Sequence, residues 1–191
     1  VSTAGVPDDP VTGLLLPNDA VFVDVDPNVY PKDFALINVP TPVGGGQWQN
    51  LFHLYYIRQY KTGRPDTLNG NTFGHAWSRD LVHWEQRPDV FAADTLNIGA
   101  WDYRHVWAPS IIRHGLAYWM FYTGVNRLND QTIGFATTST IDTIDAPGQW
   151  ARQASPVHTP DRATAWVCQE HPWQFRDPFV MVDPESPVTR Y

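Results

Sequence analysis

Cysteine is almost absent from this chain of 191 residues, in which Cys168 is the only one. A single cysteine excludes an intramolecular disulfide framework and any zinc cluster built on cysteine ligands. It also leaves the compartment open between the cytoplasm and an extracytoplasmic space. No apolar stretch approaches the roughly 18 residues that a membrane-spanning helix needs. The first residue is Val1 rather than methionine, which is compatible with a leader that has been removed.

Basic residues are scarce and scattered. Thirteen Lys and Arg stand against 20 Asp and Glu, which gives a net charge of −7 and a sequence pI of about 5.3. Without a basic run, we expect neither nucleic acid nor an anionic membrane surface as a partner. The seven histidines have no His-x-x-x-His spacing, and no Gly-x-Gly-x-x-Gly or phosphate loop occurs. We therefore expect no metal site and no cofactor.

Aromatic residues and turn formers are abundant instead. Aromatics make up 14% of the chain, with 17 prolines and 13 glycines beside them. No window keeps a helical period for long, whereas short aromatic and β-branched runs alternate with turn signals. With 42% hydrophobic and only 17% charged residues, the chain has the material for a packed core. This composition predicts an all-β protein.

The chain divides into a lead and a single repetitive domain. Residues 1–32 are rich in proline and aspartate, and they contain one strand-like run, Ala20–Val25. We expect this run to lie at the edge of a sheet. Residues 33–191 are a succession of short strand-like runs, which we interpret as one domain.

A repeat runs through that domain. The run Leu51–Ile57 matches Ala117–Thr123, and Phe73–Trp77 matches Ile133–Thr137 at a similar offset. Self-similarity of four-stranded units at a nearly fixed period is typical of a β-propeller. We count two complete units and the first strand of a third, at Phe175–Val182.

Three motifs in order carry a family resemblance. They are FGHAWSRDLVHWE at Phe73–Glu85, HVWAPSII at His105–Ile112 and FRDPF at Phe175–Phe179. They resemble segments of the first, second and third blades of five-bladed β-propeller glycosidases, glycoside hydrolase families 43 and 32. The resemblance covers residues 33–183 and implies a partial five-bladed propeller, with two full blades and the start of a third.

The length has a consequence for assembly. Five units of about 66 residues would need roughly 330 residues, so a chain of 191 residues leaves the ring open. Either it is a piece of a longer chain, or copies cover the open edges. Because an unpaired apolar strand is an association site, we expect a homodimer. In it, Phe175–Val182 and the N-terminal strand would pair across the interface.

The resemblance also implies two catalytic carboxylates. Glycoside hydrolysis uses a pair of carboxyl groups across an oxocarbenium-like transition state. Asp33 matches the first-blade aspartate, a nucleophile in family 32 and a base in family 43. Asp177 matches the aspartate that holds the sugar and stabilises charge in the transition state. Asp26, in Asp26-Pro27-Asn28, is an alternative to Asp33. Asp33 and Asp177 also fit a simpler role as turn residues that cap the backbone.

Five further residues are candidate sugar contacts around these carboxylates: Asp102, His105, Trp107, Ser110 and Arg176. Trp107 fits two positions equally well, as a stacking platform in the central funnel or as packing between blades. Ser110 stands where family 43 members often carry an aspartate. No residue of this chain matches the acid/base glutamate, which the family carries on its fourth blade.

Two functions therefore remain open. The first is a glycoside hydrolase-like protein that acts on or binds furanosides or pentosides, of the fructosidase, arabinofuranosidase or xylosidase type. The second is a catalytically incomplete carbohydrate-binding or assembly module.

Overall fold

The computed structural model describes residues 22–60, 69–139, 149–160 and 174–182, and Cys168 lies outside them. Within these residues the chain forms strands only, which confirms the all-β prediction. No helix there is long and apolar enough to cross a membrane. The strands are β1 Val29–Asn38, β2 Thr41–Gly44, β3 Gln47–Gln49, β4 Phe52–Tyr60, β5 Thr72–Ser78, β6 Trp84–Ala92, β7 His105–His114, β8 Ala117–Val125, β9 Gln131–Thr138 and β10 Ala151–Arg152.

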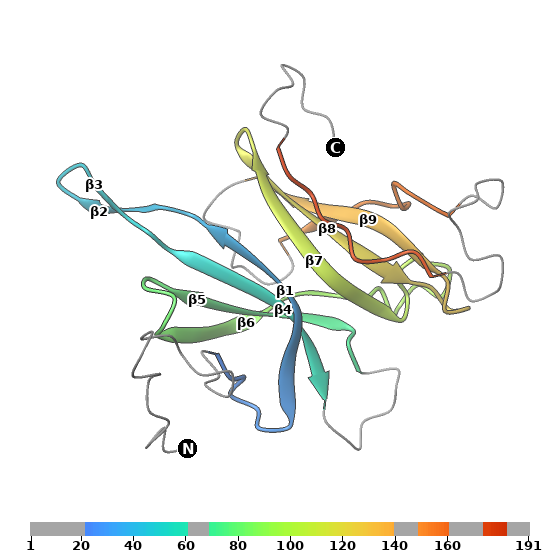
Figure 1. Ribbon diagram of the computed structural model, residues 1–191. Coiled ribbons are helices and arrows are strands. Elements are labelled where there is room, and N and C mark those ends of the chain that lie inside the picture. The colour runs from blue at the N-terminus through green and yellow to red at the C-terminus, as the bar shows by residue number, and fades with distance from the viewer. Residues whose placement is uncertain (1–21, 61–68, 140–148, 161–173, 183–191) are drawn as a thin grey trace, which may run out of the picture.

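Eight of the strands form two antiparallel sheets of the same design. The first has the order β1-β4-β5-β6 and the second, read from its inner edge, β7-β8-β9-β10. Each is a meander in which the strand that comes first in sequence forms the inner edge. The two inner strands, β1 and β7, lie against each other (Figure 1). These sheets are the two predicted propeller blades, called blade I and blade II below.

Aromatic rings fill the wedge between the blades. Tyr122 of β8 is fully buried and meets Phe73 of β5 at 6.1 Å and Phe91 of β6 at 5.0 Å, both edge to face. Trp101 stacks on the other side of Tyr122 at 5.0 Å. Edge-to-face and offset ring pairs stabilise a core beyond the area that they bury. Part of the aromatic content of the chain is therefore used to join one blade to the next.

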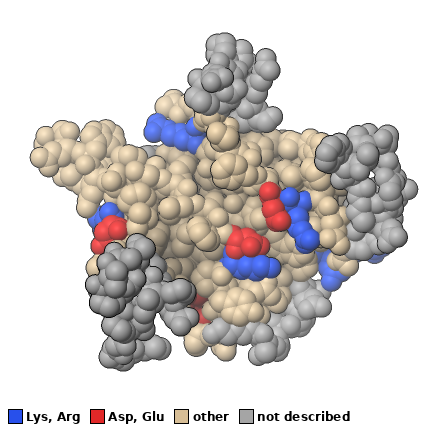
Figure 2. All heavy atoms as spheres, viewed as in Figure 1, with Lys and Arg blue, Asp and Glu red and all other residues tan. Residues whose placement is uncertain are grey.

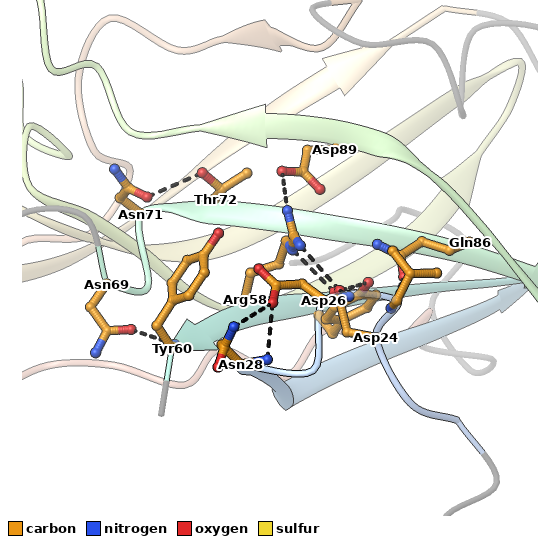
Figure 3. A network of polar contacts seen from close by, with 12 residues as sticks. Asp24, Asp26, Asn28, Arg58, Tyr60, Asn69, Asn71, Thr72, Gln86 and Asp89 are labelled. Atoms are coloured by element: carbon orange, nitrogen blue, oxygen red, sulfur yellow. Dashed lines mark hydrogen bonds and ion pairs between the residues drawn. The ribbon is translucent and has the colours of Figure 1, made fainter. Parts of the chain in front are cut away.

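The segment that precedes β1 is tied to the outer part of blade I (Figure 3). Asp24 is buried and accepts hydrogen bonds from Arg58 at 3.1 Å and from the Tyr56 hydroxyl at 2.8 Å. Arg58 also donates to Asp89 at 3.2 Å. A buried carboxylate needs such partners because it has lost its water. Residues 22–25, the described part of the expected edge strand, are irregular, and β1 begins at Val29, ahead of the boundary expected at Asp33.

Residues 174–182 run along β7 as an extended segment rather than as a strand (Figure 1). Two of its backbone N–H groups donate to side chains of blade II: Asp177 to Thr123 Oγ1 at 2.9 Å and Val180 to Ser110 Oγ at 3.1 Å. Among the described residues, no second strand forms a ladder with it. The segment occupies the place expected for the inner strand of a third blade.

Candidate active site

Two adjoining cavities lie where β1, β7 and the 174–182 segment converge. The first, called the funnel cavity here, has a volume of about 610 Å³, and the second, the inner-strand cavity, about 520 Å³. Asp33 and Asp177 line both. The funnel cavity is also lined by Lys32, Ile57, Gln59, Asn69, Arg104, His105, Trp107, Asn129 and Arg176. The inner-strand cavity is also lined by Phe34, Ala35, Leu36, Ala108, Pro109, Ser110, Ile111, Pro178, Phe179 and Val180.

A backbone irregularity recurs at the matching position of all three inner segments. Asp33, Ala108 and Asp177 have φ angles of 41°, 46° and 63°. In β1 the strand register shifts between Lys32 and Phe34, and β7 has an equivalent shift at Ala108. A bulge of this kind re-aims a side chain out of the regular alternation of a strand. Two of the three re-aimed positions carry carboxylates.

Each carboxylate of the site has a cationic neighbour in sequence. Lys32 Nζ lies 4.0 Å from Asp33 Oδ2, and Arg176 Nε lies 3.8 Å from Asp177 Oδ2. All four side chains are substantially exposed, so these ion pairs contribute little to stability. Their position at the cavity wall leaves both carboxylates open to solvent and to a bound molecule.

Trp107 holds both positions that the sequence left open. Its indole lines the funnel cavity and also packs against the core between the blades. His105 stacks on it with ring centroids 5.0 Å apart. Gly70, in the left-handed region with φ of 70°, allows this placement, because an added Cβ would lie 2.9 Å from the indole nitrogen of Trp107. The indole of Trp107 is therefore held in place by its close contact with Gly70.

Ser110 and Asp102 are placed differently from the other candidates. Ser110 lines the inner-strand cavity, and its hydroxyl already accepts the N–H of Val180. Asp102 lines neither cavity and is fully buried. It accepts a hydrogen bond from the Tyr122 hydroxyl at 2.8 Å and pairs with Arg152 Nε at 3.1 Å. Contrary to expectation, Asp102 therefore presents no surface to a sugar.

Asp26 is also set apart from the cavities. Its Oδ1 accepts the backbone N–H of Asn28 at 2.9 Å, which makes it a turn residue. Between the two alternatives for the first-blade aspartate, the described geometry brings Asp33 to Asp177 and leaves Asp26 in the lead.

Several polar residues of the funnel cavity had not been singled out in the sequence. Asn69 and Asn129 lie in the loops β4–β5 and β8–β9, at matching places of the two units. They are separated by the same offset as Phe73 and Ile133 of the matching strands β5 and β9, so the repeat itself contained the signal. Gln59, at the end of β4, and Arg104, next to His105, complete the polar wall.

A metal centre does not form in this part of the molecule. Among the described residues, no three His, Cys, Asp or Glu side chains cluster in a way that could hold a metal ion. The funnel cavity itself offers two carboxylates and the polar side chains around them.

Asp33 and Asp177 line the same two cavities beside blades that repeat one design, and a pair of carboxyl groups is what glycoside hydrolysis uses. Residues 41–186 match the sequence profile of Glycosyl hydrolases family 43. This match extends over most of the chain, and the protein belongs to that family.

Similar solved structures include enzymes of the same family. The α-L-arabinanase of Cellvibrio cellulosa, complexed with arabinohexaose, is 16% identical with a TM-score of 0.49, over 81% of this chain and 42% of its own. The RS223 β-xylosidase is 16% identical with a TM-score of 0.47, over 68% and 37%. The GH43_1 enzyme from Xanthomonas citri is 14% identical with a TM-score of 0.47, over 67% and 33%. The matched region is thus well under half of each of these structures.

Proposed function

We propose that the funnel cavity binds a furanoside or pentoside of the arabinose or xylose type and that its two aspartates act in cleavage of the glycosidic bond. The observation that carries the proposal is that Asp33 and Asp177 line both cavities. They reach this place from β1 and from the 174–182 segment, near opposite ends of the described chain. Membership of family 43 favours such a substrate over the fructosides that the family 32 resemblance also allowed.

The chemistry assigns different roles to the two carboxylates. As a base, Asp33 takes a proton from a water molecule that attacks the anomeric carbon while the bond to the leaving oxygen breaks. As a nucleophile, its carboxylate forms the bond to that carbon directly. Asp177 stabilises the positive charge that develops on the sugar ring. The leaving oxygen takes its proton from a third group.

The remaining candidates fit sugar contacts. Trp107 presents an indole held by Gly70, and aromatic faces pack well against the C–H faces of sugar rings. His105 and Arg176 supply hydrogen-bond donors in the same funnel cavity, and Ser110 supplies a hydroxyl in the adjoining one. Together they would hold a sugar between the two carboxylates.

Hydrolysis of aryl arabinofuranosides and xylosides tests the catalytic assignment. If the chain has activity, Asp33→Asn should lower kcat by about 100-fold or more, the scale of a general acid–base contribution. The matched control is Asp26→Asn, which removes a charge from the lead and should leave kcat unchanged. An active protein that is indifferent to Asp33→Asn contradicts the assignment.

A catalytically incomplete binding module is the second candidate. The observation in its favour is that Asp33 and Asp177 are the only carboxyl groups among the described residues that line the two cavities. Calorimetric titration with arabino- and xylo-oligosaccharides, followed by product analysis, separates the two functions. Binding without product favours the module. In either case Asp177→Ala should weaken binding and leave the fold intact, whereas unfolding would indicate a capping role.

We also propose that the protein forms a homodimer through the open side of its inner segments. Phe34, Phe179 and Met181 are 68%, 85% and 62% exposed there, and an uncovered apolar strand edge favours association. The contact should bury more than about 1,000 Å². A stable 21.7 kDa monomer by light scattering at micromolar concentration contradicts this assembly.

A further inference from the structure

A two-stranded hairpin projects from blade I as a sheet of its own. It consists of β2 and β3 and the glycines that join them, and it extends away from both blades (Figure 1). Gly44, Gly45 and Gly46 have φ angles of 96°, 60° and 76°, and an added Cβ would meet nothing within 4 Å at any of them. The tip of the hairpin therefore lies in open solvent.

The hairpin is an addition to the blade design. In blade II the corresponding connection, between β7 and β8, is the tight turn Gly115-Leu116. In blade I the first two strands of the sheet are joined by residues 39–51. A two-stranded ribbon is at best marginally stable by itself, and residues 42–50 of this one are all exposed.

The surface of the hairpin is neutral and has one large aromatic platform. No Asp, Glu, Lys or Arg occurs between residues 34 and 57, and the projection carries neither blue nor red atoms in Figure 2. Trp48 is 66% exposed and pairs across the ribbon with Pro42. At the base of the hairpin, Asn38 Nδ2 donates to Asn50 Oδ1 at 3.0 Å.

We propose that Trp48, with the amides of Asn38 and Asn50, forms a second carbohydrate-binding site for a neutral polysaccharide. This proposal rests on the proposed function for its class of ligand. An exposed indole offers an apolar face to a sugar ring while its N–H stays available to a hydroxyl. The side-chain amide nitrogen of Asn50 and the side-chain carbonyl oxygen of Asn38 add a donor and an acceptor at the base of the same hairpin. A surface without charge fits an uncharged ligand better than a nucleic acid or a charged peptide.

The position of the hairpin separates this site from the funnel. Asp33 of β1 lines the funnel cavity, and Asn38 pairs with Phe52 at the end of the same strand, where the hairpin leaves. Strands rise about 3.3 Å per residue, so the stretch from Asp33 to Asn38 spans roughly 16 Å. One polysaccharide held at Trp48 leaves the funnel free for another segment, which raises the effective concentration of substrate.

Nuclear magnetic resonance of the indole N–H groups reads the two sites separately. Arabino- and xylo-oligosaccharides are added to the full chain, with the Trp48 and Trp107 signals identified by their loss in Trp48→Ala and Trp107→Ala. We expect the Trp48 signal to shift on titration, including in the Trp107→Ala variant. A Trp48 signal that is unmoved by both sugar series overturns the second site, whatever Trp107 does. A silent Trp107 signal counts against the proposed function alone.

Retardation in native gels containing arabinan or xylan tests the same site with polymers. Trp48→Ala should weaken retardation at least about fivefold, the scale of one lost aromatic contact, and Trp48→Tyr should retain most of it. The matched control is Leu116→Ala, because Leu116 is 83% exposed in the equivalent turn of blade II. Equal loss in both variants overturns the proposal. So does a Trp48 signal that shifts with protein concentration alone, because that result assigns the hairpin to a second copy.

Discussion

The two blades hold the segments that enter them by the same buried pair. In blade I the hydroxyl of Tyr56 donates to Asp24 at 2.8 Å, and in blade II the hydroxyl of Tyr122 donates to Asp102 at 2.8 Å. Tyr56 and Tyr122 occupy matching positions of the repeat, in the runs Leu51–Ile57 and Ala117–Thr123. The lead before β1 therefore does for blade I what the loop between β6 and β7 does for blade II. The lead therefore belongs to the packing of blade I.

The arginines that pair with these two aspartates differ in the blades that they contact. Arg58 lies on β4 of blade I and binds Asp24 in the lead that precedes the same blade. Arg152 lies on β10, pairs with Asp102, donates to the backbone carbonyl of Ala92 in blade I and sits 4.6 Å from the centre of the Phe91 ring. Arg58 therefore contacts blade I and its lead, whereas Arg152 also joins blade II to blade I.

Burial affects the pKa values of Asp24 and Asp102 differently. Burial alone would raise the pKa of Asp24, but hydrogen bonds from the Asp26 N–H, Arg58 and Tyr56 outweigh it and hold that pKa below its usual value. Burial raises the pKa of Asp102, and Arg152 and Tyr122 offset only part of the effect. Asp102 therefore depends more heavily on its arginine than Asp24 does.

The largest expected effect follows from removing the arginine that joins the blades. Arg152→Leu should lower the free energy of unfolding at pH 7 by about 3 to 5 kcal/mol, because it leaves Asp102 buried without its cation. The matched Arg58→Leu should cost less, since Asp24 keeps the Asp26 N–H and Tyr56. Urea unfolding of the two variants measures the difference.

The stability deficit of Arg152→Leu should also depend on pH. The pKa of Asp102 is raised already and should rise further without Arg152, so protonation relieves the buried charge as the pH falls. The deficit of Arg152→Leu relative to the unmodified chain should therefore shrink between pH 7 and pH 5. Equal deficits for both arginine variants at both pH values contradict the distinction between the blades.

A second contrast lies inside the sheets. In blade I, His53 Nδ1 and His75 Nε2 are 2.9 Å apart and buried, with their rings stacked. Blade II has Trp119 and Phe135 at the matching positions, with centroids 4.7 Å apart. One blade thus has a titratable pair where the other has only hydrocarbon and an indole. The contact between rings is preserved, but the pH response is not.

The histidine pair should make blade I sensitive to acid. Burial lowers the pKa of His75 to about 3, with further contributions from His53 and Arg87. The unfolded chain takes up the proton near pH 6.5, so the stabilisation is present above that pH and is lost as the pH falls toward 3. Between pH 7 and pH 5 this amounts to about 2 kcal/mol.

Urea midpoints measured across that range test the assignment. His75→Phe, which copies the residue of blade II, should remove most of this pH slope. His114, the exposed last residue of β7, provides the control, and His114→Gln should keep the slope. An unchanged slope in His75→Phe places the acid sensitivity elsewhere.

Much of this arrangement was predictable because the repeat is local in sequence. Matching runs at nearly constant offsets predicted both blades, and the family resemblance singled out Asp33 and Asp177 as a catalytic pair. The structure brings them to the same cavities. A repeat carries such information because each unit folds by the same hydrogen-bond pattern.

The partners of buried charges could not be predicted in this way. Asp102 was a candidate sugar contact, but its partners are Tyr122 on β8 and Arg152 on β10. Which carboxylate points inward depends on how the loop between β6 and β7 turns, and composition does not encode that turn. The three glycines at residues 44–46 are turn formers, but their sequence does not indicate that the turn closes a free hairpin.

The smallest expected effect concerns the bulge that both inner strands share. Ala108 has a φ of 46°, and an L-residue in this region costs about 1 to 2 kcal/mol that glycine does not incur. Glycine gives back about 0.4 to 1 kcal/mol through the greater entropy of the unfolded chain. Ala108→Gly should therefore raise stability by about 0.5 kcal/mol and the Tm by roughly 1 to 2 °C.

Two variants of β1 test whether the bulge or the composition of the strand is responsible. Asp33→Gly relieves the same backbone strain at the matching position, where φ is 41°, and should gain a similar small increment while losing any activity of the site. Ala35→Gly, further along β1 and outside the positive-φ positions, should instead lose about 0.5 to 1 kcal/mol. Scanning calorimetry can also show that Ala108→Gly is destabilised as much as Ala35→Gly. In that case the positive φ of Ala108 does not strain the backbone. The shared kink then aims the aspartates without a measurable cost to the fold.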